Sequence, residues 1–320
     1  MPRRSERSAG RRADESAPGR LSRRTLLASL GGLGLGAVGC SGSSSGSGSS
    51  SGSANDAGAA AAYLLPFFAP GLNEPPVLRS GPAQRLVFGL ADDDVVPLAA
   101  GPERLAFSVA SDGASLGSFE VQRHDDGVPR PYYPLMVTFA APGLYTVTAE
   151  VGGTALETNV RVVEPDQVAL PAPGDEALAV ATPTVDDARG VDPICTRNPP
   201  CPFHEVSFDE ALRDGRPTAL LVSSPAYCQT AICGPVLENL VEMAEGRDLA
   251  VIHAEVYADA AAVEGDVLQA SPAPIVERYG LTFEPVLFGY GSDGRLVDLL
   301  GFVFDRVETA ALLDALAPGG

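Results

Sequence analysis

The pattern of hydrophobic and polar positions changes along the chain. From about residue 84 to residue 163, apolar residues alternate with polar ones, most clearly over residues 145–151, and a period of two indicates strands with one buried face. Dipeptides that favour tight turns separate the apolar runs. These turn signals are Asp112-Gly113, Pro142-Gly143 and Gly152-Gly153. The pattern predicts strands over residues 85–90, 104–109, 135–140, 144–151 and 157–163.

The strand-rich region resembles a known all-β module. Residues 142–147 (PGLYTV) are similar to the penultimate strand of many bacterial immunoglobulin-like modules. Five to seven short strands in about 80 residues suit such a sandwich, which we place at residues 81–164. His124 lies between two of the strands, and we interpret it as a histidine of a polar loop rather than a ligand.

After about residue 194 the pattern becomes that of an α/β domain. Continuous apolar runs such as residues 218–223 are expected in a sheet that is covered on both faces. The predicted strands are residues 218–223, 249–256, 285–290 and 295–303, and the predicted helices are residues 208–213, 236–244, 273–279 and 307–316. Five prolines among residues 164–193 indicate an extended linker over residues 165–193, between the two domains.

Charge removes several classes of function. The formal net charge is −19, and residues 1–39 hold eight Arg against three acidic residues, so the rest of the chain carries −24. A body this acidic lacks the basic surface that nucleic acid requires, and we expect no nucleic-acid partner. The chain contains no Lys, which excludes lysine Schiff-base enzymes and the phosphate-loop lysine.

Residues 1–39 have the layout of an export signal. An Arg-rich start is followed by the apolar run 25–38, which is too short and too rich in Gly to span a membrane comfortably. Residues 22–27 (SRRTLL) resemble the twin-arginine export motif, and a general secretion signal is the alternative.

The end of this segment resembles a bacterial lipobox. In residues 37–40 (AVGC) small residues precede Cys40, which would become the lipidated first residue; an ordinary cleavage site is the alternative. Residues 41–53 are all Ser and Gly, the composition of a flexible tether. We therefore expect residues 40–80 to be a tether and extended segment, and the protein to be an exported lipoprotein on the extracytoplasmic face of the cell membrane.

Four cysteines remain in the body of the chain. An even number in an exported protein indicates disulfides, and proximity along the chain favours Cys195 with Cys201 and Cys228 with Cys233. We interpret Cys195 and Cys201 as a structural disulfide that closes a Pro-rich loop. The alternatives are a second redox dithiol, or a copper or zinc site that also uses His204. We expect no metal and no cofactor.

The region around Cys233 resembles the thioredoxin-like family over residues 195–320. The resemblance rests on Cys233-Gly234-Pro235, on residues 208–222 (FDEALRDGRPTALLV) and on residues 284–287 (EPVL), which are similar to the segment of the family's cis-proline. It implies a thioredoxin-like domain over residues 194–320, with Cys233 as a catalytic residue. Cys228 lies five residues earlier, and a short loop can bring it to Cys233 as the second catalytic cysteine of a redox-active disulfide. The resemblance also implies a peptide-binding edge that includes Gly234, Pro235, Glu284 and Pro285.

Physical chemistry points to the same cysteine. Cys233 would lie at a helix N-terminus, where free N–H groups stabilise a thiolate, and a thiolate is the species that attacks a disulfide. The sequence also departs from the family. Val236 replaces the second family cysteine, Ile232 replaces a Trp, and Ser223 and Ser224 stand where the strand would carry an acid.

Three functions remain open. The first is an extracytoplasmic thiol–disulfide oxidoreductase that acts through a Cys228/Cys233 dithiol on a protein disulfide or dithiol partner. The second is a thiol peroxidase, because the Cys-x4-Cys spacing resembles that of Q-type peroxiredoxins, although Pro225 stands where that family needs Thr or Ser. The third is a non-catalytic surface lipoprotein with structural disulfides.

His253 and Glu255, two residues apart on one predicted strand, are expected to form a buried, hydrogen-bonded pair.

Overall fold

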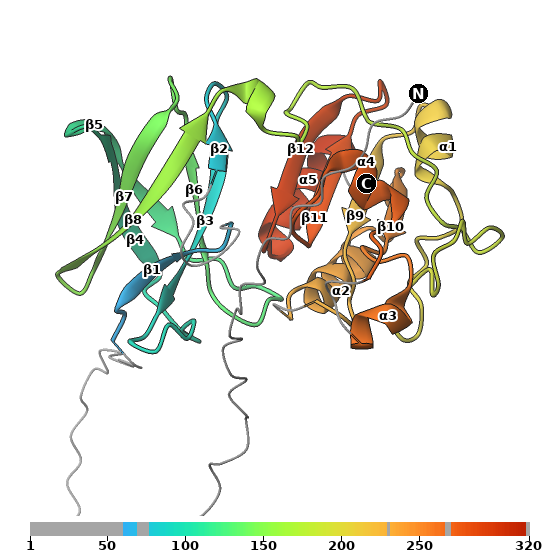
Figure 1. Cartoon of the computed structure of the whole chain (residues 1–320), viewed down its shortest axis with the longest axis horizontal. Helices are drawn as coiled ribbons and strands as arrows, with labels where there is room; N and C mark the ends of the chain where they lie inside the picture. Colours follow the sequence, from blue (N-terminus) through green and yellow to red (C-terminus); the bar gives the residue numbers. More distant parts are fainter. Residues whose placement is uncertain (1–59, 69–76, 229–230, 266–269, 318–320) are drawn as a thin grey trace, which may run out of the picture. The chain divides into compact units, whose positions relative to one another are not determined.

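Strands dominate the first half of the described chain. The computed structural model describes residues 60–68, 77–228, 231–265 and 270–317. One sheet has the order β1-β3-β6 and consists of β1 (Tyr63–Pro66), β3 (Gln84–Ala91) and β6 (Tyr133–Val137) (Figure 1). The other has the order β2-β8-β7-β4-β5 and consists of β2 (Val77–Arg79), β4 (Arg104–Ser111), β5 (Ala114–Gln122), β7 (Gly143–Val151) and β8 (Thr154–Val163).

The two sheets share one apolar core. Phe88 of β3 and Phe107 of β4 are fully buried, and their ring centroids lie 5.5 Å apart. In β4 and β7 the buried and exposed positions alternate, as the sequence pattern requires. The Asp112-Gly113 turn has positive φ at both residues, the conformation that a tight hairpin needs and that Gly adopts without strain.

The strands predicted from the sequence are confirmed, with three additions. β5 was not predicted individually, because its alternation is weak: only Val121 of its nine residues is buried. β1 and β2 lie within residues 40–80, the segment expected to be a tether, and they pair with β3 and β8. The sandwich therefore begins before residue 81. The proposed signal peptide, Cys40 and the Ser/Gly run lie outside the described residues.

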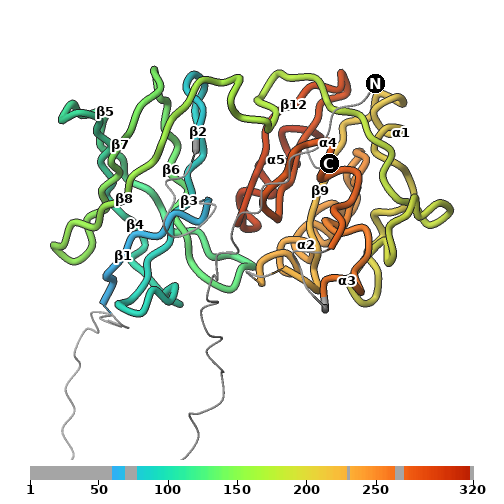
Figure 2. Tube along the Cα trace, in the orientation of Figure 1, coloured from blue at the N-terminus to red at the C-terminus, as the bar shows by residue number. Residues whose placement is uncertain are grey.

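Residues 165–193 are packed rather than free. After the short helix η1 (Pro165–Gln167) the segment passes the start of β12 (Leu296–Gly301), an edge strand of the four-stranded sheet, and continues towards α1 (Figure 2). The Gly174 and Ala177 N–H groups donate to the carbonyls of Leu296 and Gly294, at 2.7 and 2.9 Å. Val191 is 1% exposed. This segment is extended, as its prolines predict, but it packs against the four-stranded sheet instead of linking two bodies freely.

The second half of the described chain combines helices with a four-stranded mixed sheet. The sheet order is β10-β9-β11-β12; β9 and β10 are parallel, and the other neighbours are antiparallel. The elements are α1 (Phe208–Arg213), β9 (Thr218–Val222), α2 (Cys233–Met243), β10 (Ala250–Ala254), α3 (Ala260–Gly265), α4 (Pro274–Tyr279), β11 (Val286–Tyr290), β12 (Leu296–Gly301) and α5 (Arg306–Leu316). Every helix and strand expected in this region is present, and α3 is additional.

Helices cover both faces of this sheet. Ala219 and Leu221 of β9 pack in one cluster with residues of α2 and α5, whereas Leu220 and Val222 pack in another with residues of α1 and α4. All five residues of β9 are buried, which explains why this strand is continuously apolar.

Two helix starts matter for function. Helix α2 begins at Cys233, three residues before the predicted start, so Pro235 lies in the first turn, where its missing N–H is not needed. Asp305 caps α5 and accepts a hydrogen bond from the Glu308 N–H at 3.0 Å.

No helix among the described residues is long and apolar enough to cross a membrane.

Candidate functional site

The candidate active site is a disulfide at the start of α2. Cys228 and Cys233 are bonded, with their Cα atoms 5.9 Å apart, which confirms this predicted pairing. Cys233 is the first residue of α2 and is fully buried. Cys228 lies in the loop after β9 and is half-buried, so it is the more exposed residue of the two. The Cys233 N–H also points at the Cys228 sulfur, at 3.4 Å.

A carboxylate faces the buried sulfur. Glu284 Oε2 lies 3.4 Å from Cys233 Sγ and accepts a hydrogen bond from the Ser224 N–H at 2.6 Å. Burial of the Glu284 carboxyl raises its pKa to about 7, and the nearby Glu255 also raises it. This acid can therefore both give and take a proton near neutral pH.

Strand register explains how Glu284 reaches the site. In the antiparallel pair β9–β11, Val286 lies opposite Val222, so two residues further along, Glu284 comes opposite Ser224. The sequence places no acid at the end of β9, and we assigned Glu284 to substrate binding. The structure brings its carboxylate to Cys233 from the neighbouring strand instead. The contact between Glu284 and Cys233 depends on the register of β9 and β11, which cannot be read from the sequence.

The other expected binding residues surround the disulfide. Gly234 and Pro235 follow Cys233 in the first turn of α2 and are half-buried. The Glu284–Pro285 peptide is cis, and Pro285 is buried directly before β11. Their part in substrate binding stays a prediction.

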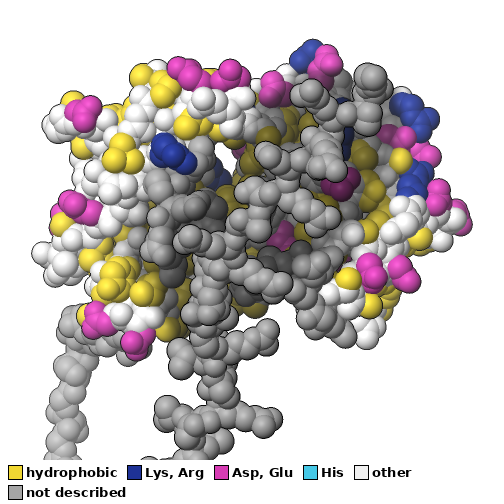
Figure 3. Space-filling view, viewed as in Figure 1, with side chains coloured by type: hydrophobic (Ala, Val, Ile, Leu, Met, Phe, Trp, Pro, Cys, Tyr) yellow, Lys and Arg dark blue, Asp and Glu magenta, His cyan; other side chains and the backbone are white. Residues whose placement is uncertain are grey.

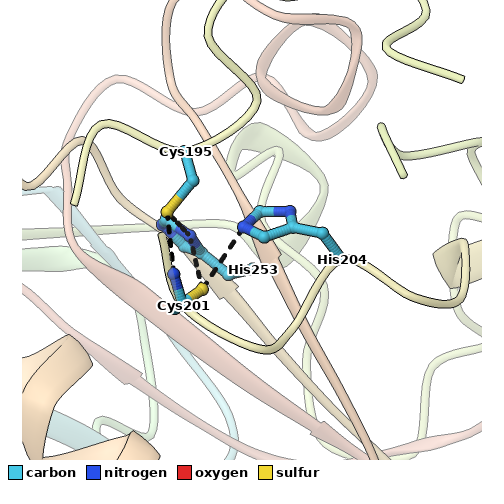
Figure 4. A group of neighbouring side chains, drawn as sticks. All are labelled: Cys195, Cys201, His204 and His253. Atoms are coloured by element: carbon cyan, nitrogen blue, oxygen red, sulfur yellow. Dashed lines mark hydrogen bonds between the residues drawn. The ribbon is translucent and has the colours of Figure 1, made fainter. Parts of the chain in front are cut away.

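A second cluster of side chains corrects the expected structural disulfide. Cys195 and Cys201 are free thiols, each 5% exposed, and they lie against His204 and His253 (Figure 4). His253 Nδ1 is 3.7 Å from Cys195 Sγ and 3.5 Å from Cys201 Sγ, and His204 Nε2 is 3.3 Å from Cys201 Sγ. His253 lies in β10, more than 50 residues after Cys201 in the sequence. The contact between the cysteines and this histidine therefore could not be predicted from spacing along the chain.

His253 and Glu255 are both buried but have separate partners. His253 Nε2 lies 3.0 Å from the carbonyl oxygen of Ser223, to which it can donate. Glu255 accepts hydrogen bonds from the N–H and the hydroxyl of Thr196, at 2.6 and 3.2 Å. Burial raises the pKa of Glu255. The expected hydrogen-bonded pair is therefore replaced by two separate interactions, one on each side of the second cluster.

His124 belongs to neither cysteine cluster. Its Nδ1 lies 3.1 Å from the Asp305 carboxylate, and the hydrogen bond with Asp305 raises the pKa of His124. Nearby, Glu308 accepts two hydrogen bonds from Arg85 at 2.6 and 2.5 Å and one from Tyr132. The surroundings of His124 are thus a structural network between β3, the loop before β6 and α5.

The visible surface carries scattered acidic side chains and isolated basic ones, without a gathered basic patch among its described residues (Figure 3). This agrees with the excess of Asp and Glu in the sequence.

Comparisons with known proteins yield distant structural likeness only. No family model and no curated protein matches the chain. The Lin-41 filamin domain is 16% identical and aligns with 27% of this chain and 82% of its own, with a TM-score of 0.21. A chimeric titin Z1Z2 is 17% identical over 28% of this chain and 84% of its own, with a TM-score of 0.18. The ZirS C-terminal domain is 13% identical over 40% of this chain and 86% of its own, with a TM-score of 0.22.

At these TM-scores the likenesses carry no argument about the site. The described chain is mostly β-sheet with some helices, and its structural neighbours include immunoglobulin-like domains such as those of filamin and titin.

Proposed function

We propose that this protein is an extracytoplasmic thiol–disulfide oxidoreductase, in which a thioredoxin-like domain follows an immunoglobulin-like sandwich. The observation that carries the proposal is the Cys228–Cys233 disulfide, with Cys233 at the first position of α2 and 3.4 Å from Glu284. The sheet order β10-β9-β11-β12, with α2 following β9, supports the thioredoxin-like assignment.

Accessibility divides the roles of the two cysteines. We assign the approach of a partner thiolate to Cys228, because this residue is half-buried whereas Cys233 is fully buried. Cys233 then acts as the leaving and resolving thiol. The N-terminus of α2 stabilises its thiolate, and this lowers the barrier for its departure.

The reaction balances as a two-electron exchange. One thiolate of a substrate dithiol attacks Cys228 Sγ; a substrate–Cys228 disulfide forms, the Cys228–Cys233 bond breaks, and Cys233 leaves as a thiolate. Glu284 gives that thiolate a proton. The second substrate thiolate then attacks the substrate sulfur of the mixed disulfide and releases Cys228 as a thiolate, which takes a proton from solvent. The substrate dithiol is oxidised to a disulfide and the Cys228–Cys233 disulfide is reduced to a dithiol; the reverse sequence reduces a substrate disulfide.

The proposed location follows from the N-terminal sequence. From the twin-arginine-like motif and Cys40 we propose that the protein is lipid-anchored on the extracytoplasmic side of the membrane. Its redox partner would be a protein that carries a disulfide or a dithiol. In this arrangement the Ser/Gly run would hold the folded domains away from the lipid.

The burial of Cys233 favours a second candidate. A disulfide with one fully buried sulfur also suits a structural link in a non-catalytic binding protein. The two candidates differ in reduction potential, because structural disulfides resist reduction to below about −300 mV.

A redox titration of the full chain separates these functions. Thiols are trapped by alkylation at each potential, and peptides are assigned by mass spectrometry. We expect the Cys228–Cys233 bond to be reduced at a potential above about −280 mV, in the range of catalytic dithiols. A Cys195→Ser/Cys201→Ser variant is the matched control, and its Cys228–Cys233 bond should be reduced in the same range.

Two outcomes would reject the oxidoreductase. Reduction only below about −300 mV would leave the binding protein. Turnover of hydrogen peroxide through Cys228, without reduction of protein disulfides such as those of insulin, would indicate the thiol peroxidase.

A further inference from the structure

The second cysteine cluster has the composition of a metal site. Its four donors are two thiols and two imidazoles, all buried, and one ligand atom from each lies within 4.8 Å of every other. Two thiolates and two imidazoles in a closed site are the ligand set of structural zinc. Cys195, Cys201 and His204 come from one loop, and His253 comes from β10, so an ion would join this loop to the sheet.

The distances suit a tetrahedron. With Zn–S near 2.3 Å and Zn–N near 2.05 Å, the sulfur–nitrogen edge of a tetrahedral site is about 3.6 Å. The sulfur–nitrogen distances from His253 to Cys195, from His253 to Cys201 and from His204 to Cys201 are 3.7, 3.5 and 3.3 Å. The donors therefore stand at their coordination spacing before any ion is considered (Figure 4).

The surroundings match those of bound metal ligands. A metal-bound histidine commonly donates its other ring N–H to a carbonyl, and His253 Nε2 lies 3.0 Å from the Ser223 oxygen while Nδ1 faces the sulfurs. The Cys201 N–H points at Cys195 Sγ at 3.4 Å, an arrangement that stabilises a thiolate. His204 is 2% exposed, and its Nδ1 has no hydrogen-bond partner. Nε2, which faces Cys201 Sγ, would be the ligand atom, and Nδ1 would then carry the ring proton.

We propose that Cys195, Cys201, His204 and His253 bind one Zn²⁺ ion in a closed tetrahedral site. This replaces the expectation of no metal, and it assigns the cluster a structural role. Protein side chains would fill all four coordination positions of the ion, so no position would remain open for water or substrate. The ion would secure the loop of residues 195–204 to β10, next to the Cys228–Cys233 disulfide but separate from it.

The test is metal binding by the full chain, purified under reducing conditions. The probes are Zn²⁺ alone and Co²⁺ alone, with metal content measured by mass spectrometry. We expect one Zn²⁺ per chain, and a Co²⁺ form with the visible and thiolate charge-transfer bands of a tetrahedral two-sulfur site. Bound Zn²⁺ should protect Cys195 and Cys201 from alkylation, and a chelator should remove this protection.

Matched variants locate the ion. Second-shell changes weaken zinc sites by about 10- to 100-fold, so the loss of a direct ligand in Cys201→Ser or His204→Gln should weaken binding by at least about 100-fold. The chain has three histidines, and His124→Gln leaves the two in the cluster, so it should keep full affinity. Cys228→Ser/Cys233→Ser should also keep it, because it removes the other cysteine pair.

Three results would overturn the proposal. One is that the unaltered chain binds neither Zn²⁺ nor Co²⁺. Another is a Cys195–Cys201 disulfide that forms equally fast in air with and without zinc, which would restore the structural disulfide. The third is preferential binding of Cu(I) with an affinity that His204→Gln leaves unchanged, which would indicate a two-thiolate copper site.

Discussion

Glu284 offers the sharpest test of the site, through the pH dependence of stability in Glu284→Gln. The carboxyl is buried beside Cys233, and burial raises its pKa from 4.5 to about 7. The folded state thus holds this proton more tightly than the unfolded chain does. The stabilising contribution of the neutral carboxyl is complete below about pH 4.5 and is lost as the pH rises through about 7.

The magnitude follows from these two values. A pKa difference of this size corresponds to about 3 kcal/mol, most of which is lost between pH 5 and pH 7. Gln is neutral at every pH and can still accept the hydrogen bond from the Ser224 N–H. Relative to the unaltered chain, Glu284→Gln should therefore gain about 2 to 3 kcal/mol of unfolding free energy between pH 5 and pH 8.

The assay is urea unfolding of the oxidised proteins, followed by circular dichroism, at several pH values. Glu277→Gln on α4 is the matched control, because Glu277 is exposed and its charge lies in solvent. Its free energy relative to the unaltered chain should stay the same from pH 5 to pH 8. A Glu284→Gln difference that also stays constant within about 0.5 kcal/mol would refute the argument that this carboxyl is desolvated.

Four further results are expected. Glu284→Gln should slow exchange at the Cys228–Cys233 disulfide by about 100-fold at pH 7, because positioned proton transfer contributes at least that much; an unchanged stopped-flow rate would remove Glu284 from the mechanism. Removal of zinc by a chelator should lower the melting temperature by about 5–10 °C, since an ion at 100 times its Kd contributes about 2.7 kcal/mol; no change in calorimetry would contradict this. Arg85→Leu leaves Glu308 buried without its ion pair and should cost about 3–5 kcal/mol in urea unfolding, whereas a loss below about 1 kcal/mol would mean that Glu308 is well solvated. His124→Asn should destabilise the chain at pH 6 more than at pH 9, because the pKa of His124 is raised by Asp305 and the ion pair is lost as the pH rises through that value; equal losses at both pH values would contradict it.

Local pattern accounts for most of the fold. The helix at residues 208–213 and the buried strand β9 follow directly from the spacing of apolar residues and from the N-cap at Ser207. β5 escapes the same analysis because eight of its nine residues are not buried, so no apolar face marks it. β1 was expected to be extended, but its pairing with β3 is a long-range contact that no local pattern reveals.

The candidate sites show the same division. Cys228 and Cys233 are close in sequence, and their pairing could be predicted from that spacing. Glu284 reaches Cys233, and His253 reaches Cys195, only through the neighbouring strands of the sheet. The sequence supplied the cysteines of each site, whereas the partners that define their chemistry depended on strand order and register.

One peptide unit connects these two sites. The Ser223 carbonyl lies 3.0 Å from His253 Nε2, and the N–H of the same peptide, which belongs to Ser224, donates to Glu284 at 2.6 Å. The hydrogen bond at one end of a peptide polarises the bond at the other end. His253 and Glu284 are therefore hydrogen-bonded to the two ends of a single peptide plane at the end of β9. The loop that carries Cys195 is tied to the same region, because the Thr196 hydroxyl accepts a hydrogen bond from the Ala226 N–H in the segment leading to Cys228. An ion that fixes His253 and this loop would thus also fix the frame in which Cys233 meets its proton donor.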